Sequence, residues 1–390
     1  MGNILTYVQT ELRRFSERPF GAVDSLVLAE LAYVRFGGAV PGFQLFRRGA
    51  RLRGLYKAEL MGTLFPSLPA EERSVINGGK YPTGSKNRYA LLAAAAMSPR
   101  FRDIRLRFFA EEQDDMRMQQ FAAVTFLLPG REAFIAFRGT DSTLTGWKED
   151  FNMALISPIP SQETAAKYLA AVGRRLIFRR TLMTGGHSKG GNLAVYAAMT
   201  AAPALQKRIA AVYNHDGPGF KTGVLDHPGY RAVEPRIVKI LPQSSIVGML
   251  LSDNDDYAVV ESRRFGPMQH DAFSWEVRNG HFVYAEKLTS SAEYMNRTLK
   301  AWLEAMPDAQ RQTLIEALFQ VLESAGADTI KDIVEGRIHF LRSILSQYRS
   351  LDADTRKMIA RLVRALLKLS VKNLRREKAQ KESTPPSPEN

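Results

Sequence analysis

The chain has 390 residues, of which 45% are apolar and 24% charged, so its composition is globular and excludes a wholly disordered or collagen-like protein. It contains no cysteine, which excludes disulfides, thiolate metal sites and a cysteine nucleophile. Its 54 Lys and Arg against 40 Asp and Glu give a net charge of +14. That excess favours anionic partners such as nucleic acid or lipid headgroups but does not indicate a fold.

The sequence predicts a cytoplasmic protein. Residues 1–20 carry charges at five positions and lack a long apolar core, unlike a secretory signal or a membrane anchor. The most apolar stretch elsewhere, Tyr89–Met97, is too short to span a bilayer.

Residues 1–120 are predicted to form a mostly helical N-terminal part that packs on the core. Leu26–Tyr33 has the apolar content of a packed helix, and Asp24 is a candidate cap for it. Tyr89–Met97 is an alanine-rich helix candidate that ends at Ser98-Pro99.

Residues 121–290 show the alternation of strands and helices that is typical of an α/β fold. Phe121–Leu128 and Ala133–Phe137 flank Pro129-Gly130 and predict a hairpin. A mostly parallel sheet covered on both faces by helices follows from the rest of the pattern. The later segments are helices at Ser161–Phe178 and Asn192–Thr200 and strands at Thr181–Thr184, Ile209–Tyr213, Ile237–Leu241 and Tyr257–Ser262.

Residues 291–376 are predicted to be a C-terminal helical region, and residues 377–390 a disordered tail. Asp354–Leu374 combines an apolar stripe with a cationic border. Two interpretations are open: the stripe packs on the preceding helices, or it makes a peripheral contact with an anionic membrane. No helix-turn-helix, zinc finger or aromatic–basic platform supports binding to nucleic acid.

Gly186-His187-Ser188-Lys189-Gly190 fits the pattern G-x-S-x-G. That pattern makes a sharp turn between a strand and a helix, where glycines permit crowded backbone and the serine hydroxyl stands above the sheet. The Thr181–Thr184 strand precedes it and the Asn192–Thr200 helix follows it, as the motif requires. Ser188 is therefore the candidate nucleophile, against the alternative of a glycine-rich connection in an α/β sheet.

A nucleophilic serine needs a histidine base, which α/β hydrolases place well downstream of the serine. His270 fits that position and His281 competes with it. His187, as the second residue of the serine motif, is better explained as structural, and His339 as part of the helical tail. The six histidines are His187, His215, His227, His270, His281 and His339.

The acid that orients the histidine is expected at the carboxyl end of a sheet strand. Asp216 follows the Ile209–Tyr213 strand directly and is the first candidate, although an aspartate before a glycine is also common in turns. The alternatives follow the next strand and are Asp253, Asp255 and Asp256.

An oxyanion hole would complete the site. One donor is normally the backbone N–H after the nucleophile, here that of Lys189. The other comes from a loop after an early strand, and the run from Phe137 to Ser142, F-R-G-T-D-S, supplies such a loop.

Several motifs together resemble known lipase-like proteins. F-R-G-T-D-S followed by Gly146-Trp147-Lys148-Glu149-Asp150, with the later G-H-S-x-G, resembles the class 3 (fungal-type) lipases. G-G-H-S-K-G-G-N-L-A, D-G-P-G-F and Q-H-D-A-F-S-W resemble more closely the Mbeg-like bacterial family of lipase-like α/β hydrolases, over roughly residues 24–300.

The resemblance implies an α/β-hydrolase fold with helical additions at both ends, with Ser188 as nucleophile, Thr140 as an oxyanion-hole residue and His270 as base. The chain departs from the lipases at the acid. They carry an aspartate after the strand that corresponds to Ile237–Leu241, where this chain has Pro242-Gln243-Ser244-Ser245.

Two functions are compatible with these observations. The first is a serine esterase that cleaves a carboxylic ester, of a small molecule or a lipid, without a cofactor or a metal. The second is a hydrolase-fold binding or membrane-associated module that has lost catalysis, which the missing lipase aspartate and the large helical additions would explain.

Overall fold

A nine-stranded sheet runs through the part of the chain that this computed structural model describes: residues 2–44, 48–64, 85–140, 157–176, 181–221, 223–251 and 256–304, with a few single positions elsewhere. The strand order is β1-β2-β3-β4-β5-β6-β7-β8-β11, and β9 and β10 form a separate antiparallel pair. The strands are β1 (Ala50–Arg51), β2 (Arg105–Asp114), β3 (Gln119–Leu127), β4 (Glu132–Phe137), β5 (Thr181–His187), β6 (Ile209–His215), β7 (Ile237–Pro242), β8 (Ala258–Val260), β9 (Val277–Arg278), β10 (His281–Phe282) and β11 (Tyr284–Ala285).

The sheet is mixed. From β4 to β8 neighbouring strands are parallel, whereas β1 to β4 and the β8–β11 pair are antiparallel. The central strands are buried along nearly their whole length: every residue of β3 except Leu127 is buried, and so is every residue of β4 except Glu132. Burial of both strand faces requires helices on both sides of the sheet.

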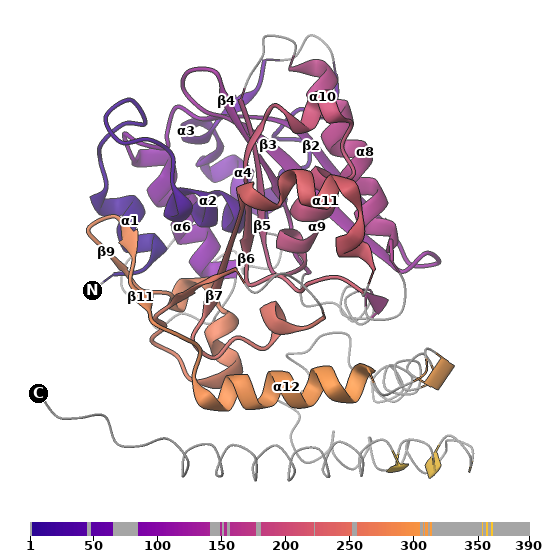
Figure 1. The fold of residues 1–390 in the computed structure, drawn as a ribbon. Helices are drawn as coiled ribbons and strands as arrows, with labels where there is room; N and C mark the ends of the chain where they lie inside the picture. The colour runs from indigo at the N-terminus through magenta and orange to yellow at the C-terminus, as the bar shows by residue number, and fades with distance from the viewer. Residues whose placement is uncertain are drawn as a thin grey trace, which may run out of the picture.

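Each face of the sheet is covered by helices from a different part of the chain (Figure 1). The strand order does not reverse, and right-handed crossovers then place the connecting helices on one face. The opposite face is covered by helices that precede the parallel strands. The connecting helices are α8 (Pro160–Arg175), α9 (Lys189–Met199) and α11 (Pro228–Val233); the N-terminal ones are α1 (Ile4–Thr10), α2 (Ala22–Leu31) and α6 (Ser85–Met97).

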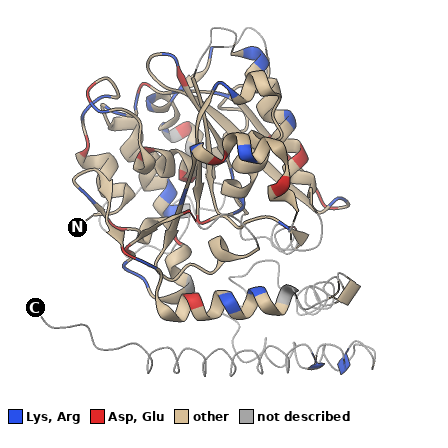
Figure 2. Cartoon of the chain, in the orientation of Figure 1, with Lys and Arg blue, Asp and Glu red and all other residues tan. Residues whose placement is uncertain are grey.

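The remaining helices are short, apart from α12, which follows the last strand of the sheet and lies beyond the ends of β7 and β11 in Figure 1. In Figure 2 basic and acidic segments alternate over the ribbon, and α12 carries both signs. These helices are α3 (Leu52–Leu55), α4 (Ala58–Leu64), α10 (Pro203–Gln206), η1 (Val224–Asp226), η2 (Glu234–Arg236), η3 (Val247–Met249), η4 (Gly266–His270), η5 (Ala272–Ser274) and α12 (Ser290–Glu304).

The predicted hairpin is confirmed as β3 and β4, and the predicted helices and strands between residues 160 and 262 are confirmed with small shifts of their ends. The expectation that residues 1–120 are mostly helical was wrong for β1 and β2, which pair with each other and extend the sheet beyond β3. The second half of β2 carries exposed charged and polar residues, Glu111–Gln113, so the apolar alternation that marks a strand is lost there.

Asp24 does not cap α2 as predicted. The N-cap is Gly21, and Asp24 lies three residues further on, where its carboxylate accepts a hydrogen bond from the Gly21 N–H at 2.9 Å. It also receives the Tyr7 hydroxyl at 2.8 Å and the guanidinium of Arg100 through both carboxylate oxygens, at 2.8 and 2.7 Å. Asp24 therefore ties α1, α2 and the segment after α6 into one layer.

The predicted amphipathic helix Asp354–Leu374 and the tail 377–390 lie outside the described residues, apart from a few isolated positions of the helix. In the part of the chain that the structure covers, no helix combines the length and the apolar character needed to cross a membrane.

Candidate active site

Ser188 occupies the turn between β5 and α9, with φ 58° and ψ −134°. A residue with a side chain rarely adopts a positive φ, so this backbone is strained and must be held by its surroundings. The Ser188 N–H donates to the carbonyl oxygen of His215 on β6 at 2.9 Å, and the residue is half-buried. This is the geometry of a nucleophile elbow, in which the turn lifts the serine above the sheet.

The two glycines of the motif are required by close backbone contacts. A β-carbon on Gly186 would lie 2.3 Å from the carbonyl carbon of Gly190, and one on Gly190 would lie 2.2 Å from the carbonyl oxygen of Phe137. Neither backbone atom can move without displacing the strand or helix that carries it. The five-residue motif therefore fixes the approach of α9 to β4 and β5.

Asp216 and His270 are in direct contact: Nδ1 of His270 donates to Oδ2 of Asp216 at 2.6 Å. Asp216 directly follows β6, with φ 52°, and its side chain is fully buried. His270 ends the turn η4, and its imidazole is 28% exposed. A buried carboxylate on Nδ1 fixes the tautomer of the ring and leaves Nε2 as its basic nitrogen.

The other carboxylate oxygen of Asp216 is held from the segment after β7. Oδ1 accepts the Ser245 hydroxyl at 2.5 Å and the Gly248 N–H at 3.2 Å. Ser245 belongs to the four-residue run where the class 3 lipases carry their aspartate. The chain thus has its buried carboxylate one strand earlier, and a hydroxyl from the lipase position supports it.

Ser188 and His270 lie at the same end of the sheet, and His187 contacts His270 there. The His187 ring lies 4.7 Å from the His270 ring, centroid to centroid, and His187 directly precedes Ser188. No hydrogen bond joins the Ser188 hydroxyl to His270 among the residues that the structure describes. In enzymes without substrate this bond is often long and tightens when substrate binds.

The predicted oxyanion loop packs against the elbow. A β-carbon on Gly139 would lie 3.3 Å from Cβ of Ser188 and 2.5 Å from the carbonyl oxygen of His187, so only glycine fits there. Thr140, the next residue, is half-buried, and residues 141–148 of the loop lie outside the described part of the chain.

Lys189 is the second predicted oxyanion residue, and its side chain is fully buried. Its Nζ donates to Oε2 of Glu149 at 2.7 Å and to the carbonyl oxygen of Gln120 at 3.0 Å. Glu149 also accepts the Ser161 hydroxyl at 2.6 Å. The Lys189 ammonium is therefore engaged in the core, and only its backbone N–H can serve an oxyanion.

Of the alternative candidates for base and acid, His281 and Asp256 fall within the described residues. His281 lies on β10, with Nε2 3.3 Å from Nη2 of Arg18. Asp253 and Asp255 fall outside the described residues, as does His339. Asp256 is exposed, and it is Asp216 that occupies Nδ1 of His270.

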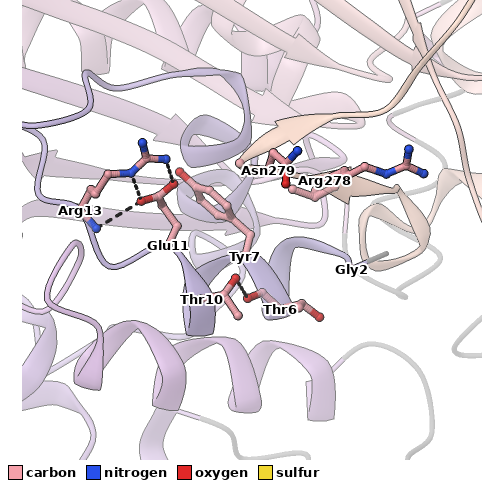
Figure 3. A pocket seen from close by; sticks show the side chains of 10 residues that line it. Gly2, Thr6, Tyr7, Thr10, Glu11, Arg13, Arg278 and Asn279 are labelled. Carbon is pink, nitrogen blue, oxygen red and sulfur yellow. Dashed lines mark hydrogen bonds and ion pairs between the residues drawn. The ribbon is translucent and has the colours of Figure 1, made fainter.

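A cavity of about 600 Å³ lies elsewhere, between α1 and the β9–β10 pair (Figure 3). None of its lining residues is a predicted site residue. Glu11, the residue after α1, lines this cavity, and its Oε2 lies 2.6 Å from Nη2 of Arg13 and 2.6 Å from Nη1 of Arg18. Within the described ranges no cluster of His, Asp and Glu could hold a metal ion.

Two residues beside the predicted site were missed by sequence reasoning. Ser245 holds Asp216, and Glu30, on α2, contacts His187 with Oε1 3.1 Å from Nδ1. Ser245 could have been suspected from its place after β7. Glu30 carries no local signal, because the helix that holds it is mainly apolar and its partner His187 comes from β5.

A mixed sheet whose strands β4 to β8 are parallel, with a serine turn after β5, then an aspartate after β6 and a histidine on a later loop, defines the α/β-hydrolase fold of lipase-like proteins. The chain belongs to the Mbeg1-like family, whose model matches residues 95–320, more than half of its length.

Comparisons with solved structures and with curated proteins do not strengthen the family assignment. Among solved structures the chain is similar to M37 lipase, with 12% identity and a TM-score of 0.34 over 57% of this chain and 68% of that one. A superposition this loose carries no argument about fold or function. The comparison with curated proteins found no match.

Proposed function

We propose that this protein is a serine hydrolase that cleaves a carboxylic ester through an acyl-enzyme on Ser188. The observation that carries the proposal is the 2.6 Å contact between Asp216 and His270 at the end of the sheet where Ser188 sits on its strained turn. The alternative of an inactive module rests on the missing lipase aspartate and on the helical additions at both ends. The contact of Asp216 with His270, and its support by Ser245, weigh against the first of these grounds.

Each residue has a defined step in this reaction. Oγ of Ser188 attacks the ester carbonyl carbon while Nε2 of His270 takes the hydroxyl proton, and Asp216 stabilises the imidazolium that forms. His270 then returns the proton to the leaving alcohol as the C–O bond breaks. Water attacks the acyl-enzyme by the same route, again with His270 as base, and releases the acid and free Ser188.

The negative charge on the carbonyl oxygen would be received by the backbone N–H groups of Lys189 and Thr140. Such preorganised donors contribute about 3 kcal/mol each to transition-state stabilisation. The packing of Gly139 against Ser188 supports this role for the loop, because it holds the following residue beside the elbow.

The surroundings of His270 favour a substrate with an apolar acyl part. Phe265 and Met268 lie on the turn that ends at His270, and they are 82% and 61% exposed. The half-buried apolar segment Ile246–Leu251 adjoins Asp216 through Gly248. Exposed apolar side chains grouped at a polar site are typical of a surface that receives an apolar ligand.

A fluorophosphonate probe, which reacts with activated serines, tests the proposal directly. We expect labelling of the wild-type protein and its loss in Ser188→Ala. Ser291→Ala, which removes an exposed hydroxyl at the start of α12, is the matched control and should label normally. A folded wild-type protein that takes no label would support the binding-module alternative instead.

The acyl preference can be measured with p-nitrophenyl esters of increasing chain length. If Phe265 and Met268 contact the acyl part, kcat/KM should rise with chain length, and Phe265→Ser should reduce that rise while leaving the acetate ester unaffected. A flat chain-length profile in the wild type would refute the lipid-like substrate without touching the assignment of Ser188.

A further inference from the structure

His187 directly precedes the proposed nucleophile, and each of its ring nitrogens lies near an oxygen atom. Nε2 lies 2.8 Å from the backbone carbonyl oxygen of His270, and Nδ1 lies 3.1 Å from Oε1 of Glu30. The rings of His187 and His270 are tilted by 30°, with their centroids 4.7 Å apart. His187 therefore contacts the base through its main chain and through its ring.

The Glu30 carboxylate beside Nδ1 favours the charged form of His187, although Nδ1 and Oε1 meet at ion-pair distance without hydrogen-bond geometry. Burial alone would lower the pKa of His187, but the Glu30 carboxylate outweighs burial and the pKa is raised. Burial likewise opposes ionisation of Glu30, yet Arg88 and His187 hold its pKa at about 2.

Glu30 is itself fixed within the N-terminal layer. Its side chain is 1% exposed, and Oε2 accepts the Nε–H of Arg88, on α6, at 2.9 Å. The Arg88 guanidinium in turn lies over the Tyr33 ring, 3.9 Å from its centroid. The acceptor that faces His187 thus rests on two helices that cover the sheet from the opposite side to α9.

We propose that Glu30 and His187 are positioning residues for His270, so that the N-terminal helices are part of the catalytic machinery. This inference rests on the proposed function. Asp216 holds only the ring of His270, which sits on a short turn that begins at Gly266 with φ 55°. His187 anchors the main chain of the same residue and covers one face of its ring, and these three contacts define where Nε2 points.

A purely structural role for the Glu30–His187 pair would affect stability but not the turnover of the folded protein. The positioning role predicts a fall in kcat, because a displacement of about 1 Å at a reacting group can reduce the rate about 10²-fold. We therefore expect His187→Ala to lower kcat by about 10²-fold with KM near the wild-type value, since substrate binding does not involve this residue.

Two conservative variants sharpen the test. His187→Gln retains a side-chain N–H that can donate to the His270 carbonyl, and it should recover part of the lost kcat. Glu30→Gln with His187→Gln replaces the ion pair by two amides that can hydrogen-bond to each other, and it should recover more than His187→Gln alone. Recovery in this order is expected only if the hydrogen bonds, rather than the charges, position His270.

Arg208→Gln is the matched control for lost stability. Arg208 donates to the carbonyl oxygens of Gly173 and Leu176 at the end of α8, and it precedes β6 whereas Asp216 follows that strand at its other end. It should lower the free energy of unfolding while kcat stays at the wild-type value. If folded His187→Ala also keeps the wild-type kcat, the positioning role is refuted.

A readout that does not need turnover separates this inference from the proposed function. The proton shared by His270 Nδ1 and Asp216 should give a far-downfield proton NMR resonance, which Asp216→Asn should abolish. We expect His187→Ala to shift or broaden that resonance if the ring loses its orientation. An unchanged resonance would overturn the positioning role, whereas a wild-type protein with this resonance but no esterase activity would overturn only the function.

Discussion

Two buried aspartates, Asp24 in the N-terminal layer and Asp216 at the end of β6, are held in opposite ways. Asp24 is paired with Arg100, which is fully buried and occupies both carboxylate oxygens. One carboxylate oxygen of Asp216 accepts the Ser245 hydroxyl and the Gly248 N–H. The other contacts His270, whose side chain is 28% exposed.

The difference between their partners indicates that Asp24 supports the fold, whereas Asp216 can take part in proton transfer. The guanidinium of Arg100 does not give up its proton at any ordinary pH, and it also donates to the carbonyl oxygens of Arg13, Arg18 and Pro19, so its contacts only hold the fold. The partner of Asp216 is an imidazole, a group that can act as a general base, and it is partly exposed. A carboxylate oriented in this way can support proton transfer.

The largest expected effect is at Asp216. Asp216→Asn removes the charge that enforces the His270 tautomer, and we expect kcat to fall about 10⁴-fold with little change in fold. Steady-state ester hydrolysis, with circular dichroism to check folding, measures this.

The exposed Asp256→Asn is the control for that experiment and should keep wild-type activity. Activity of Asp216→Asn within a few-fold of wild type would transfer the acid role to another carboxylate, and the comparison between the two aspartates would fail.

Arg100→Met should reduce stability and leave kcat nearly unchanged, the opposite of Asp216→Asn. It leaves Asp24 buried without its cation, and breaking a buried ion pair in this way costs about 3–5 kcal/mol of stability. Urea unfolding should show that loss, while kcat per folded molecule stays near the wild-type value. A large fall in kcat at a temperature where the variant is folded would mean that the N-terminal ion pair also acts on the site.

A smaller effect is expected from Ser245→Ala, because it removes one of two donors to Oδ1 of Asp216. A hydrogen bond to a charged group contributes about 1.5–3 kcal/mol, so we expect a fall in kcat of about 10-fold to 10²-fold. Ser244→Ala, the neighbouring hydroxyl, which contacts Thr289, is the control. Equal activities of the two variants would show that Asp216 does not depend on the segment after β7.

The smallest expected effect is on the pH dependence of stability and involves His215, which pairs with His187 in the β5–β6 register. Its Nε2 donates to the Ser25 hydroxyl oxygen at 2.7 Å, and burial, followed by the nearby charge of His187, lowers its pKa to about 3. Below about pH 6.5 the unfolded chain takes up a proton there that the native protein does not. Stability should therefore fall as pH drops, by at most about 1.4 kcal/mol per pH unit.

His215→Gln should flatten that fall between pH 7 and pH 5, as measured by urea unfolding. His187, whose pKa is raised, contributes with the opposite sign: its stabilisation is complete at low pH and is lost as pH rises through its native pKa. Glu30, with a pKa of about 2, keeps its charge throughout this window. A variant with the wild-type slope would show that His215 is not the group responsible.

Much of the fold could be predicted because its signals are local. The apolar runs of β3 to β8 and the breaks at Pro129-Gly130 and Ser98-Pro99 lie within windows of about ten residues. β2 was not predicted, because the charged side chains in its second half are exposed and break the apolar alternation of a strand. The sequence ranked Asp216 first because it directly follows a strand, but it could not exclude three later aspartates, since the partner of His270 depends on which strand end faces it.

The sequence by itself indicated the turn at Ser188, because a β-carbon on Gly186 would meet the backbone of Gly190 only four residues later. Only the tertiary structure decided which groups surround that serine. Asp216 and His270 are 54 positions apart, and Glu30 reaches His187 from a helix on the other side of the sheet. The reason is physical: backbone geometry is set by neighbouring residues, whereas the position of a buried charge is set by partners that only packing brings within hydrogen-bonding distance.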